Sequence, residues 1–297
     1  MQILDGKLAS QAIKDDLKEK ILELKKTGQK IPHLAAILIG ANPASETYVA
    51  SKVKNCNEIG MTSSLLRFDE SITENELLQK IKELNDNADI DGILVQLPLP
   101  KSISEEKVIN AISPEKDVDG FHPVNVGKMV LELPTFISAT PYGIILLLQH
   151  YKIETEGKQV VVIGRSNIVG TPISILLSRN APFGNSTVTL CHSRTKNLKD
   201  LCLQADIIIA AIGKPKFVTM EMVKENAVVI DVGINRIKDE TKKSGYALAG
   251  DVDFVNVAPK CSFISPVPGG VGLMTIAALL MNTYKAASLS STGGLKH

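Results

Sequence analysis

The sequence predicts an α/β protein of two domains with parallel strands. Its 297 residues exceed the length of one average domain. Short apolar runs alternate with segments of helical spacing, which is the pattern of repeated βα units. A stretch rich in proline and glycine, residues 114–141, separates the two halves. We therefore expect an N-terminal α/β domain at 1–140, a second α/β domain at 141–271, and a last helix at 272–287 that packs back on the first domain.

Individual elements follow from the same patterns. In the first half, apolar runs predict strands at 34–39, 63–67 and 92–97, and helical spacing predicts helices at 45–59, 73–84 and 105–112. In the second half, strands are expected at 159–163, 187–191, 206–210 and 227–232, with a helix at 168–178 after the first of them. A strand, a glycine and a helix in this order are typical of nucleotide-binding domains. The last helix is apolar on most sides and is expected to be buried, with a frayed tail from residue 288.

Composition excludes several classes of protein. The 33 basic and 32 acidic side chains nearly cancel, which argues against nucleic acid or anionic lipid as a partner. No apolar run approaches the roughly 18 residues of a membrane span, and the N-terminus lacks the pattern of a secretory signal. Cys56, Cys191, Cys202 and Cys261 stand apart in the sequence, which predicts no metal site and suits a reducing cytoplasm.

Glycines mark a possible phosphate site. Gly164 ends a strand and Gly170 lies in the next helix, where a missing Cβ lets backbone amides approach a phosphate. Their spacing differs from both the dinucleotide fingerprint and the P-loop, so a strand-to-helix turn without a ligand is an equal alternative at this point.

Charge near this turn favours NADP over NAD. Residues 157–199 contain no Asp or Glu, while Arg165 follows the glycine and Arg194 follows the second strand. An NAD site usually places a carboxylate after that strand, whereas a 2′-phosphate needs cations and donors such as guanidinium groups. The alternative is an ordinary solvated basic face.

Four polar residues of the first half are candidates for chemistry. Tyr48 and Lys52 lie four apart on one face of a predicted helix, and Gln96 ends a predicted strand, where open α/β sheets bind ligands. Asp119 follows in a turn-prone loop. Tyr48 and Lys52 also have a plain interpretation as a surface pair, and Asp119 as an ordinary turn residue.

Five motifs in one order give these residues a common meaning. They are Tyr48-Val-Ala-Ser-Lys52, Val95-Gln96-Leu97-Pro98-Leu99-Pro100, Pro114-Glu-Lys-Asp-Val-Asp-Gly120, Gly164-Arg-Ser-Asn-Ile-Val-Gly170 and Pro266-Val-Pro-Gly-Gly-Val-Gly272. Together they resemble the bifunctional methylenetetrahydrofolate dehydrogenase/cyclohydrolase family, from about Leu4 to Tyr284. The resemblance implies a C-terminal Rossmann-like NADP-binding domain and two reactions: NADP-dependent oxidation of 5,10-methylenetetrahydrofolate, then hydrolysis of the methenyl product to 10-formyltetrahydrofolate.

The resemblance also implies roles for residues. Lys52 would be the key cyclohydrolase residue, Gln96 would orient it, Tyr48 would stack on the folate, and Asp119 would bind the pterin edge. A lysine trades protons near neutral pH only if its pKa is lowered. The remaining residues implied to bind the folate are Val95, Leu97, Pro268, Gly269 and Gly270; those implied to bind NADP are Gly164, Arg165, Ser166, Ser193, Arg194 and Ile234.

Two departures and several partners complete the expectations. Leu273 stands where the family usually has proline, and the turn at 182–186 is longer than usual. By resemblance we expect a cytoplasmic homodimer of one-carbon metabolism, serving purine biosynthesis, with Lys7 or Lys54 available to hold the glutamate tail of the folate. Two alternatives stay open: a monofunctional dehydrogenase, which the intact N-terminal set argues against, and a non-catalytic NADP-binding protein.

Overall fold

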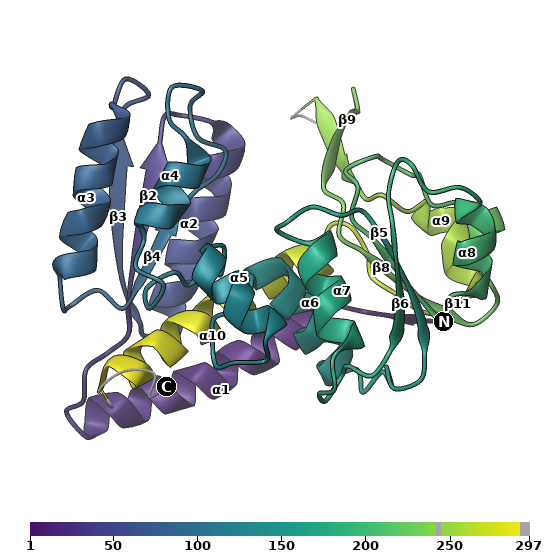
Figure 1. Ribbon diagram of the computed structural model, residues 1–297, viewed down its shortest axis with the longest axis horizontal. Helices are drawn as coiled ribbons and strands as arrows, with labels where there is room; N and C mark the ends of the chain where they lie inside the picture. The colour runs from purple at the N-terminus through teal and green to yellow at the C-terminus, as the bar shows by residue number, and fades with distance from the viewer. Residues whose placement is uncertain (242–244, 292–297) are drawn as a thin grey trace. The chain divides into compact units, whose positions relative to one another are not determined.

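The computed structural model describes residues 1–241 and 245–291, which form two compact units. One unit contains Met1–Gln11 and Thr140–Thr275, and the other contains Ala12–Ala139 and the chain from Ile276 onward. Each unit is built on its own parallel sheet (Figure 1), so the predicted two-domain α/β fold is confirmed. The first eleven residues group with the second half of the chain because β1 (Gln2–Ile3) pairs with β11 (Cys261–Ile264).

The unit that carries Lys52 has a three-stranded parallel sheet in the order β3-β2-β4. Its strands are β2 (His33–Ile39), β3 (Thr62–Phe68) and β4 (Gly92–Val95), and its helices are α2 (Pro43–Glu58), α3 (Glu74–Asp86), α4 (Glu105–Ala111) and α5 (Pro123–Val130). Parts of α1 (Gly6–Lys26) and α10 (Val271–Ser291) also belong to it. Each parallel crossover passes through a helix, as parallel pairing requires.

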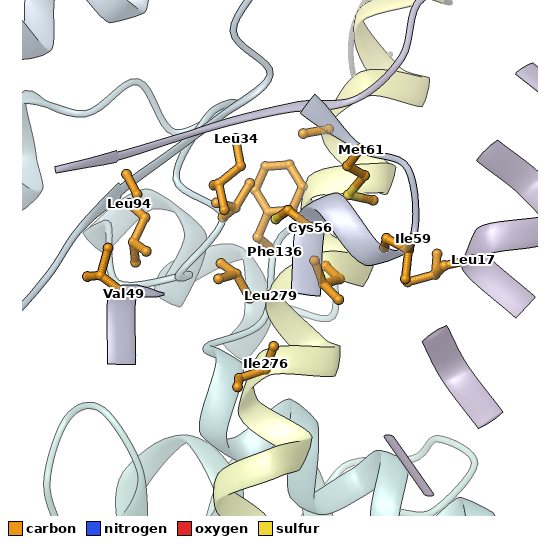
Figure 2. Packing of buried hydrophobic residues seen from close by; sticks show 14 of the residues in the cluster. Leu17, Leu34, Val49, Cys56, Ile59, Met61, Leu94, Phe136, Ile276 and Leu279 are labelled. Atoms are coloured by element: carbon orange, nitrogen blue, oxygen red, sulfur yellow. The ribbon is translucent and has the colours of Figure 1, made fainter. Parts of the chain in front are cut away.

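Strand β2 divides the core of this unit into two layers, because successive side chains point to opposite faces of a sheet. Leu34, Ala36 and Leu38 pack on one face with residues of α1, α2 and α10. Figure 2 shows this layer, in which Phe136, Cys56 and Leu279 are buried together. The alternate β2 residues pack on the other face with α3 and α4. Burial on both faces explains why β2 is apolar along nearly its whole length.

The other unit has a six-stranded sheet in the order β1-β11-β8-β7-β5-β6, and every neighbouring pair is parallel. Besides β1 and β11, its strands are β5 (Gln159–Ile163), β6 (Thr187–Cys191), β7 (Ile207–Ala210) and β8 (Ala227–Asp231), with β6 at one edge. Helices α6 (Ala139–His150), α7 (Gly170–Ser178), α8 (Leu198–Gln204) and α9 (Phe254–Val257) accompany them, with short helices at Met220–Met222 and Ala258–Lys260. The strand order reverses at β5, which is where doubly wound sheets bind dinucleotides.

Several elements differ from the sequence-based expectations. The stretch 114–141 contains α5, which begins at Pro123 with His122 as its N-cap. The last helix runs to Ser291, so the expected fraying from residue 288 is wrong as far as that residue; residues 292–297 lie outside the described chain. The strand expected to reach residue 97 ends at Val95. An antiparallel hairpin, β9 (Asn235–Lys238) and β10 (Tyr246–Ala249), was not expected.

The described residues were also compared with the requirements of a membrane span and of a metal site. Across residues 1–241 and 245–291, no helix combines the length and apolarity needed to cross a bilayer. In the same part of the chain, no three His, Cys, Asp or Glu side chains gather in an arrangement suited to a metal ion. All four cysteines are buried free thiols.

Candidate functional site

Lys52 and Gln96 contact each other in the structure. Lys52 lies on α2, one turn after Tyr48, and its Nζ donates a hydrogen bond of 3.2 Å to Gln96 Oε1. Gln96 follows β4 directly, and its backbone amide donates to Ile37 O at 3.0 Å. Its side-chain Nε2 donates to Leu97 O at 2.8 Å, which leaves Oε1 facing the lysine. A residue on a helix and a residue at a strand end are thus held together by side-chain bonds in a fixed orientation.

Asp119 lies within electrostatic range of the same lysine. Burial raises the pKa of the Asp119 carboxyl to about 6, the positive charge of Lys52 lowers that pKa, and the negative charge of Asp117 raises it. Desolvation therefore outweighs the attraction of the neighbouring amine. Lys52, Gln96 and Asp119, which are far apart in the sequence, form one polar group at the carboxyl end of β4.

Hydrogen bonds to Asp117 stabilise the loop that carries Asp119. The buried Asp117 carboxylate accepts hydrogen bonds from the amides of Phe121 at 3.2 Å and His122 at 2.8 Å, and from Asn125 Nδ2 at 2.8 Å. Gly120 has a φ of +71°, and an added Cβ would lie 2.5 Å from Ser138 N. This is a place where the chain needs glycine, because the turn combines a positive φ with close backbone contact.

A second support of the same loop comes from α10. The side chain of Asn282 is buried, and its Nδ2 donates to Val118 O at 2.8 Å and to Ile137 O at 2.9 Å. A single amide thus satisfies two main-chain carbonyls next to Asp119. Neither Asn282 nor Asp117 was singled out from the sequence, since an Asn on an apolar helix and the first Asp of an Asp-Val-Asp-Gly motif carry no distinctive signal alone.

The other residues expected to bind the folate lie in two places. Tyr48 is 39% exposed on α2, which leaves its ring accessible, and Val95 is 6% exposed at the end of β4. Leu97 precedes Pro98 across a cis peptide bond. Gly269 and Gly270 belong to the other unit, where Gly6 N donates to Gly269 O at 2.8 Å. An added Cβ on Gly6 would overlap Gly270 O, so the N-terminal segment packs directly against this backbone.

The glycine turn after β5 is built from backbone packed on backbone. Gly164 has a φ of +119°, and an added Cβ would overlap Ala211 O, which follows β7. A Cβ on Gly170 would overlap Gly164 O in the same way. Gly164 N donates to Cys191 O at 2.9 Å, which ties the turn to the end of β6. Helix α7 begins at Gly170, and the two glycines leave the main chain of the turn without side chains where a phosphate group could approach it.

Exposed donors surround this turn. Arg165 and Ser166 follow Gly164, and Ser193 and Arg194 follow β6; all four are exposed. Ser166 Oγ accepts from the amides of Val169 at 3.2 Å and Gly170 at 3.4 Å, which fixes the turn into α7. Because Gly164 is bonded to the end of β6, the two arginine-bearing segments follow neighbouring strands at the same edge of the sheet. The residues present therefore fit a nucleotide with an additional phosphate.

Ile234 lies in the loop after β8 and is 46% exposed. A Cβ built on Gly272 would lie 3.5 Å from its Cδ1, so the side chain packs near the start of α10. The flanking residues Gly233 and Asn235 are bonded to two buried aspartates, Asp231 and Asp251. The sequence assigns no role to either carboxylate.

Comparison with known proteins agrees with this geometry. Residues 4–119 match the profile of the tetrahydrofolate dehydrogenase/cyclohydrolase catalytic domain, and residues 138–291 match that of the NAD(P)-binding domain of the same family. The chain belongs to the tetrahydrofolate dehydrogenase/cyclohydrolase family. The predicted family and the nucleotide-binding character of the second half are therefore confirmed.

Relatives and solved structures align with this chain over nearly its whole length. A bifunctional protein FolD of Cytophaga hutchinsonii is 63% identical over 289 residues, covering 97% of this chain and 100% of that protein. The crystal structure of bifunctional FolD from Campylobacter jejuni has a TM-score of 0.90 and 49% identity, covering 97% of this chain and 99% of that one. A Trypanosoma brucei FolD complexed with NADP and an inhibitor has a TM-score of 0.91 and 35% identity, covering 97% of each chain.

One departure from the family pattern has a visible local effect. Leu273 lies in the first turn of α10, and its backbone amide donates to Gly270 O at 3.2 Å. Proline has no amide hydrogen and could not make this bond. The turn around 182–186 holds Phe183 and Asn185 at positive φ angles of 60° and 57°.

Proposed function

We propose that this chain oxidises 5,10-methylenetetrahydrofolate with NADP and then hydrolyses 5,10-methenyltetrahydrofolate to 10-formyltetrahydrofolate. The observation that carries the proposal is the polar group of Lys52, Gln96 and Asp119, with Lys52 Nζ 3.2 Å from Gln96 Oε1. It occurs in a chain whose two halves match the catalytic and NAD(P)-binding domains of this family. The NADP complex of the 35% identical Trypanosoma brucei FolD supports the choice of nucleotide.

Lys52 is the residue to which we assign proton transfer in the hydrolytic step. Water that attacks the methenyl carbon must lose a proton, and an amine held by one hydrogen bond to Gln96 is positioned to exchange it. Because Gln96 Nε2 is already bonded to Leu97 O, the amide keeps its acceptor oxygen toward the amine.

Asp119 and Tyr48 are assigned to folate binding. A carboxylate accepts two hydrogen bonds side by side, which matches the donors of a pterin edge. The exposed ring of Tyr48 offers a flat apolar face on which an aromatic ligand can stack. By resemblance to the family, we also assign folate binding to Val95 and Leu97 of this unit and, separately, to Pro268, Gly269 and Gly270 of the other unit.

The nucleotide is assigned to the carboxyl end of the six-stranded sheet. The Gly164 turn and the start of α7 would hold the pyrophosphate, with Ser166 in the same turn. Arg165, Ser193 and Arg194 would bind the 2′-phosphate, since guanidinium groups bind phosphate through paired hydrogen bonds. Ile234 would lie against the nicotinamide. Bound NADP supplies the hydride acceptor for the oxidation.

Assays on the purified wild-type chain test this function. With methylenetetrahydrofolate and NADP, we expect NADPH absorbance to grow only when both are present. With methenyltetrahydrofolate alone, we expect its absorbance to decay faster with enzyme than in buffer. NADPH formation without accelerated decay would indicate the monofunctional dehydrogenase, and absence of both would leave the non-catalytic NADP-binding protein. Replacing NADP with NAD should slow the first reaction.

The pKa of Asp119 predicts how folate use depends on pH. Its raised value of about 6 means that the carboxyl gains a proton as pH falls through 6 and loses an acceptor for the pterin edge. We expect dehydrogenase kcat/KM for the folate to fall about tenfold for each pH unit below 6 and to level off above it. The measurement is kcat/KM from pH 4.5 to 8. The Asp119→Asn variant should be less active but should lack this acid limb; an unchanged limb in that variant would assign the titration to another group.

Assembly, location and pathway are also proposals. We propose a homodimer, because β6 is an edge strand of the six-stranded sheet and offers unpaired main-chain groups to a second copy. Sedimentation equilibrium measures this, and a monomer at micromolar concentration would contradict it. We further propose a cytoplasmic protein of one-carbon metabolism that supplies formyl groups for purine biosynthesis. The glutamate tail of the folate is assigned to Lys7 or Lys54, whose side chains are exposed.

A further inference from the structure

The NAD(P)-binding unit contains a buried aspartate that joins the loop after β7 to the loop after β8 at one end of the sheet. Asp251 has 0% exposed surface. Its Oδ2 accepts hydrogen bonds from the amides of Ile212 at 2.7 Å and Gly213 at 2.9 Å, which follow β7. Its Oδ1 accepts from Asn235 Nδ2 at 2.9 Å, at the start of β9 just after the Ile234 loop. Its own amide donates to Asp231 Oδ1 at 2.9 Å, at the end of β8.

The loops that Asp251 joins are those expected to contact the cofactor. Ala211 precedes Ile212, whose amide is bonded to Asp251. The carbonyl oxygen of Ala211 packs so closely on Gly164 that position 164 has no room for a Cβ. The exposed Ile234 stands between Gly233, bonded to Asp231 at 3.0 Å, and Asn235, bonded to Asp251. One carboxylate therefore sets the distance between the Gly164 turn and the Ile234 loop.

Sheet order shows which half of a dinucleotide these loops would meet. The strand order reverses at β5, with β6 on one side and β7 and β8 on the other. A dinucleotide lies across the carboxyl ends of the strands at such a point. Arg194, assigned to the 2′-phosphate, follows β6, so the opposite half of the cofactor lies over β7 and β8. That half carries the nicotinamide.

We propose that Asp251 is a positioning residue for hydride transfer, which sets the loops after β7 and β8 so that the nicotinamide is held at the correct distance and angle. This inference rests on the proposed dehydrogenase function. Close packing of Gly233 and Gly250 supports it, because an added Cβ on either would overlap the carboxylate of Asp251 or Asp231. The arrangement leaves little room for these loops to shift around the carboxylates.

The Asp251→Asn variant tests the proposal. An amide at position 251 must direct its NH2 either at the two main-chain amides or at the Asn235 amide, and each orientation sets donor against donor. We expect the single-turnover rate of NADP reduction to fall about tenfold to a hundredfold, since small misplacement of reacting groups has effects of this size. Binding of adenosine 2′,5′-bisphosphate, which lacks the nicotinamide, should change less than about twofold, and cyclohydrolase activity should be retained.

A paired substitution and a matched control separate positioning from stability. Combining Asp251→Asn with Asn235→Asp restores a donor and acceptor pair across the same contact but removes the bond from Asn235 Nδ2 to Ala249 O at 3.2 Å, so it should recover part of the lost hydride rate. Asp206→Asn is the control, because Asp206 also accepts a main-chain bond, from Gln159 N at 2.8 Å, but at the amino end of the strands. It should leave the hydride rate unchanged.

Two results would overturn the proposal. One is an unchanged hydride rate in Asp251→Asn. The other is an equal loss of hydride rate and of adenosine 2′,5′-bisphosphate affinity without recovery in the double variant, which would make Asp251 a stabilising residue only. Failure of the proposed function itself would be seen separately, as an absence of folate-dependent NADP reduction in the wild-type chain that still binds the bisphosphate.

Discussion

The Lys52→Met variant is expected to lose the hydrolytic reaction while NADP binding is retained. Methionine keeps much of the length and apolar volume of the lysine side chain but cannot exchange a proton or donate to Gln96 Oε1, which Lys52 Nζ contacts at 3.2 Å. General acid and base groups contribute about a hundredfold to ten-thousandfold to a rate, so the loss should fall in this range. The measurement is the decay of methenyltetrahydrofolate under saturating enzyme, with NADP affinity determined by titration.

A lysine elsewhere in the same unit provides the control. Lys80 on α3 pairs with Glu83 at 2.8 Å at the surface, and Lys80→Met should leave both reactions unchanged because exposed pairs contribute little. Loss of NADP affinity together with hydrolysis in Lys52→Met would indicate misfolding. Retained hydrolysis in a folded Lys52→Met variant would remove the lysine from the mechanism.

Much of the fold could be predicted because burial on both faces makes parallel strands apolar throughout. The strand β5 and the strand β6 agree with their predicted bounds, and helix α3 follows a clear period of apolar residues. Such patterns depend only on which side chains face the core, and the spacing of apolar residues in the sequence indicates this. The two-domain division followed from the change in composition after residue 114.

Elements whose order depends on distant partners could not be predicted in the same way. Strand β1 has two residues and exists because it pairs with β11, more than 250 residues later. Helix α5 is short and begins at a proline in a segment that otherwise resembles a loop, and its His122 cap bonds to Val124 N at 3.1 Å. The strands β9 and β10 have four residues each, and only Ala249 among them is buried, so their hydrophobic signal is short and weak.

The site residues also fall into two groups, those that sequence motifs indicate and those that only the tertiary structure shows. Lys52, Gln96 and Asp119 were chosen from the sequence through motifs, and the structure places them in one polar group. Residues that act through main-chain bonds gave no signal. Asp251 became recognisable only when its bonds to the loop after β7 and to both ends of the loop after β8 were visible, and Asn282 only when its amide met Val118 O and Ile137 O. Satisfying buried backbone groups is a property of tertiary structure, which single-sequence patterns do not encode.

Replacing Arg165 and Arg194 together with alanine is expected to remove the preference for NADP. Both side chains are exposed beside the Gly164 turn and the end of β6, and residues 157–199 hold no acidic side chain to compete for them. A hydrogen bond to a charged group contributes about 1.5–3 kcal/mol, so two arginines should contribute a factor of roughly a hundred or more in kcat/KM for NADP. The rate with NAD should change far less, because NAD has no 2′-phosphate.

The comparison of the two nucleotides makes this test specific to the phosphate. A general disturbance of the domain would lower kcat/KM for NADP and NAD by the same factor, whereas loss of phosphate contacts lowers only the first. Arg236→Ala is the matched control: this guanidinium lies on β9, with its Cζ 4.6 Å from the centre of the Tyr246 ring, and its removal should leave the ratio unchanged. Added salt should also weaken NADP binding more in the wild type than in the double variant, because exposed charge contacts are screened. Equal salt dependence in both proteins, or an unchanged nucleotide ratio, would place the 2′-phosphate on other residues.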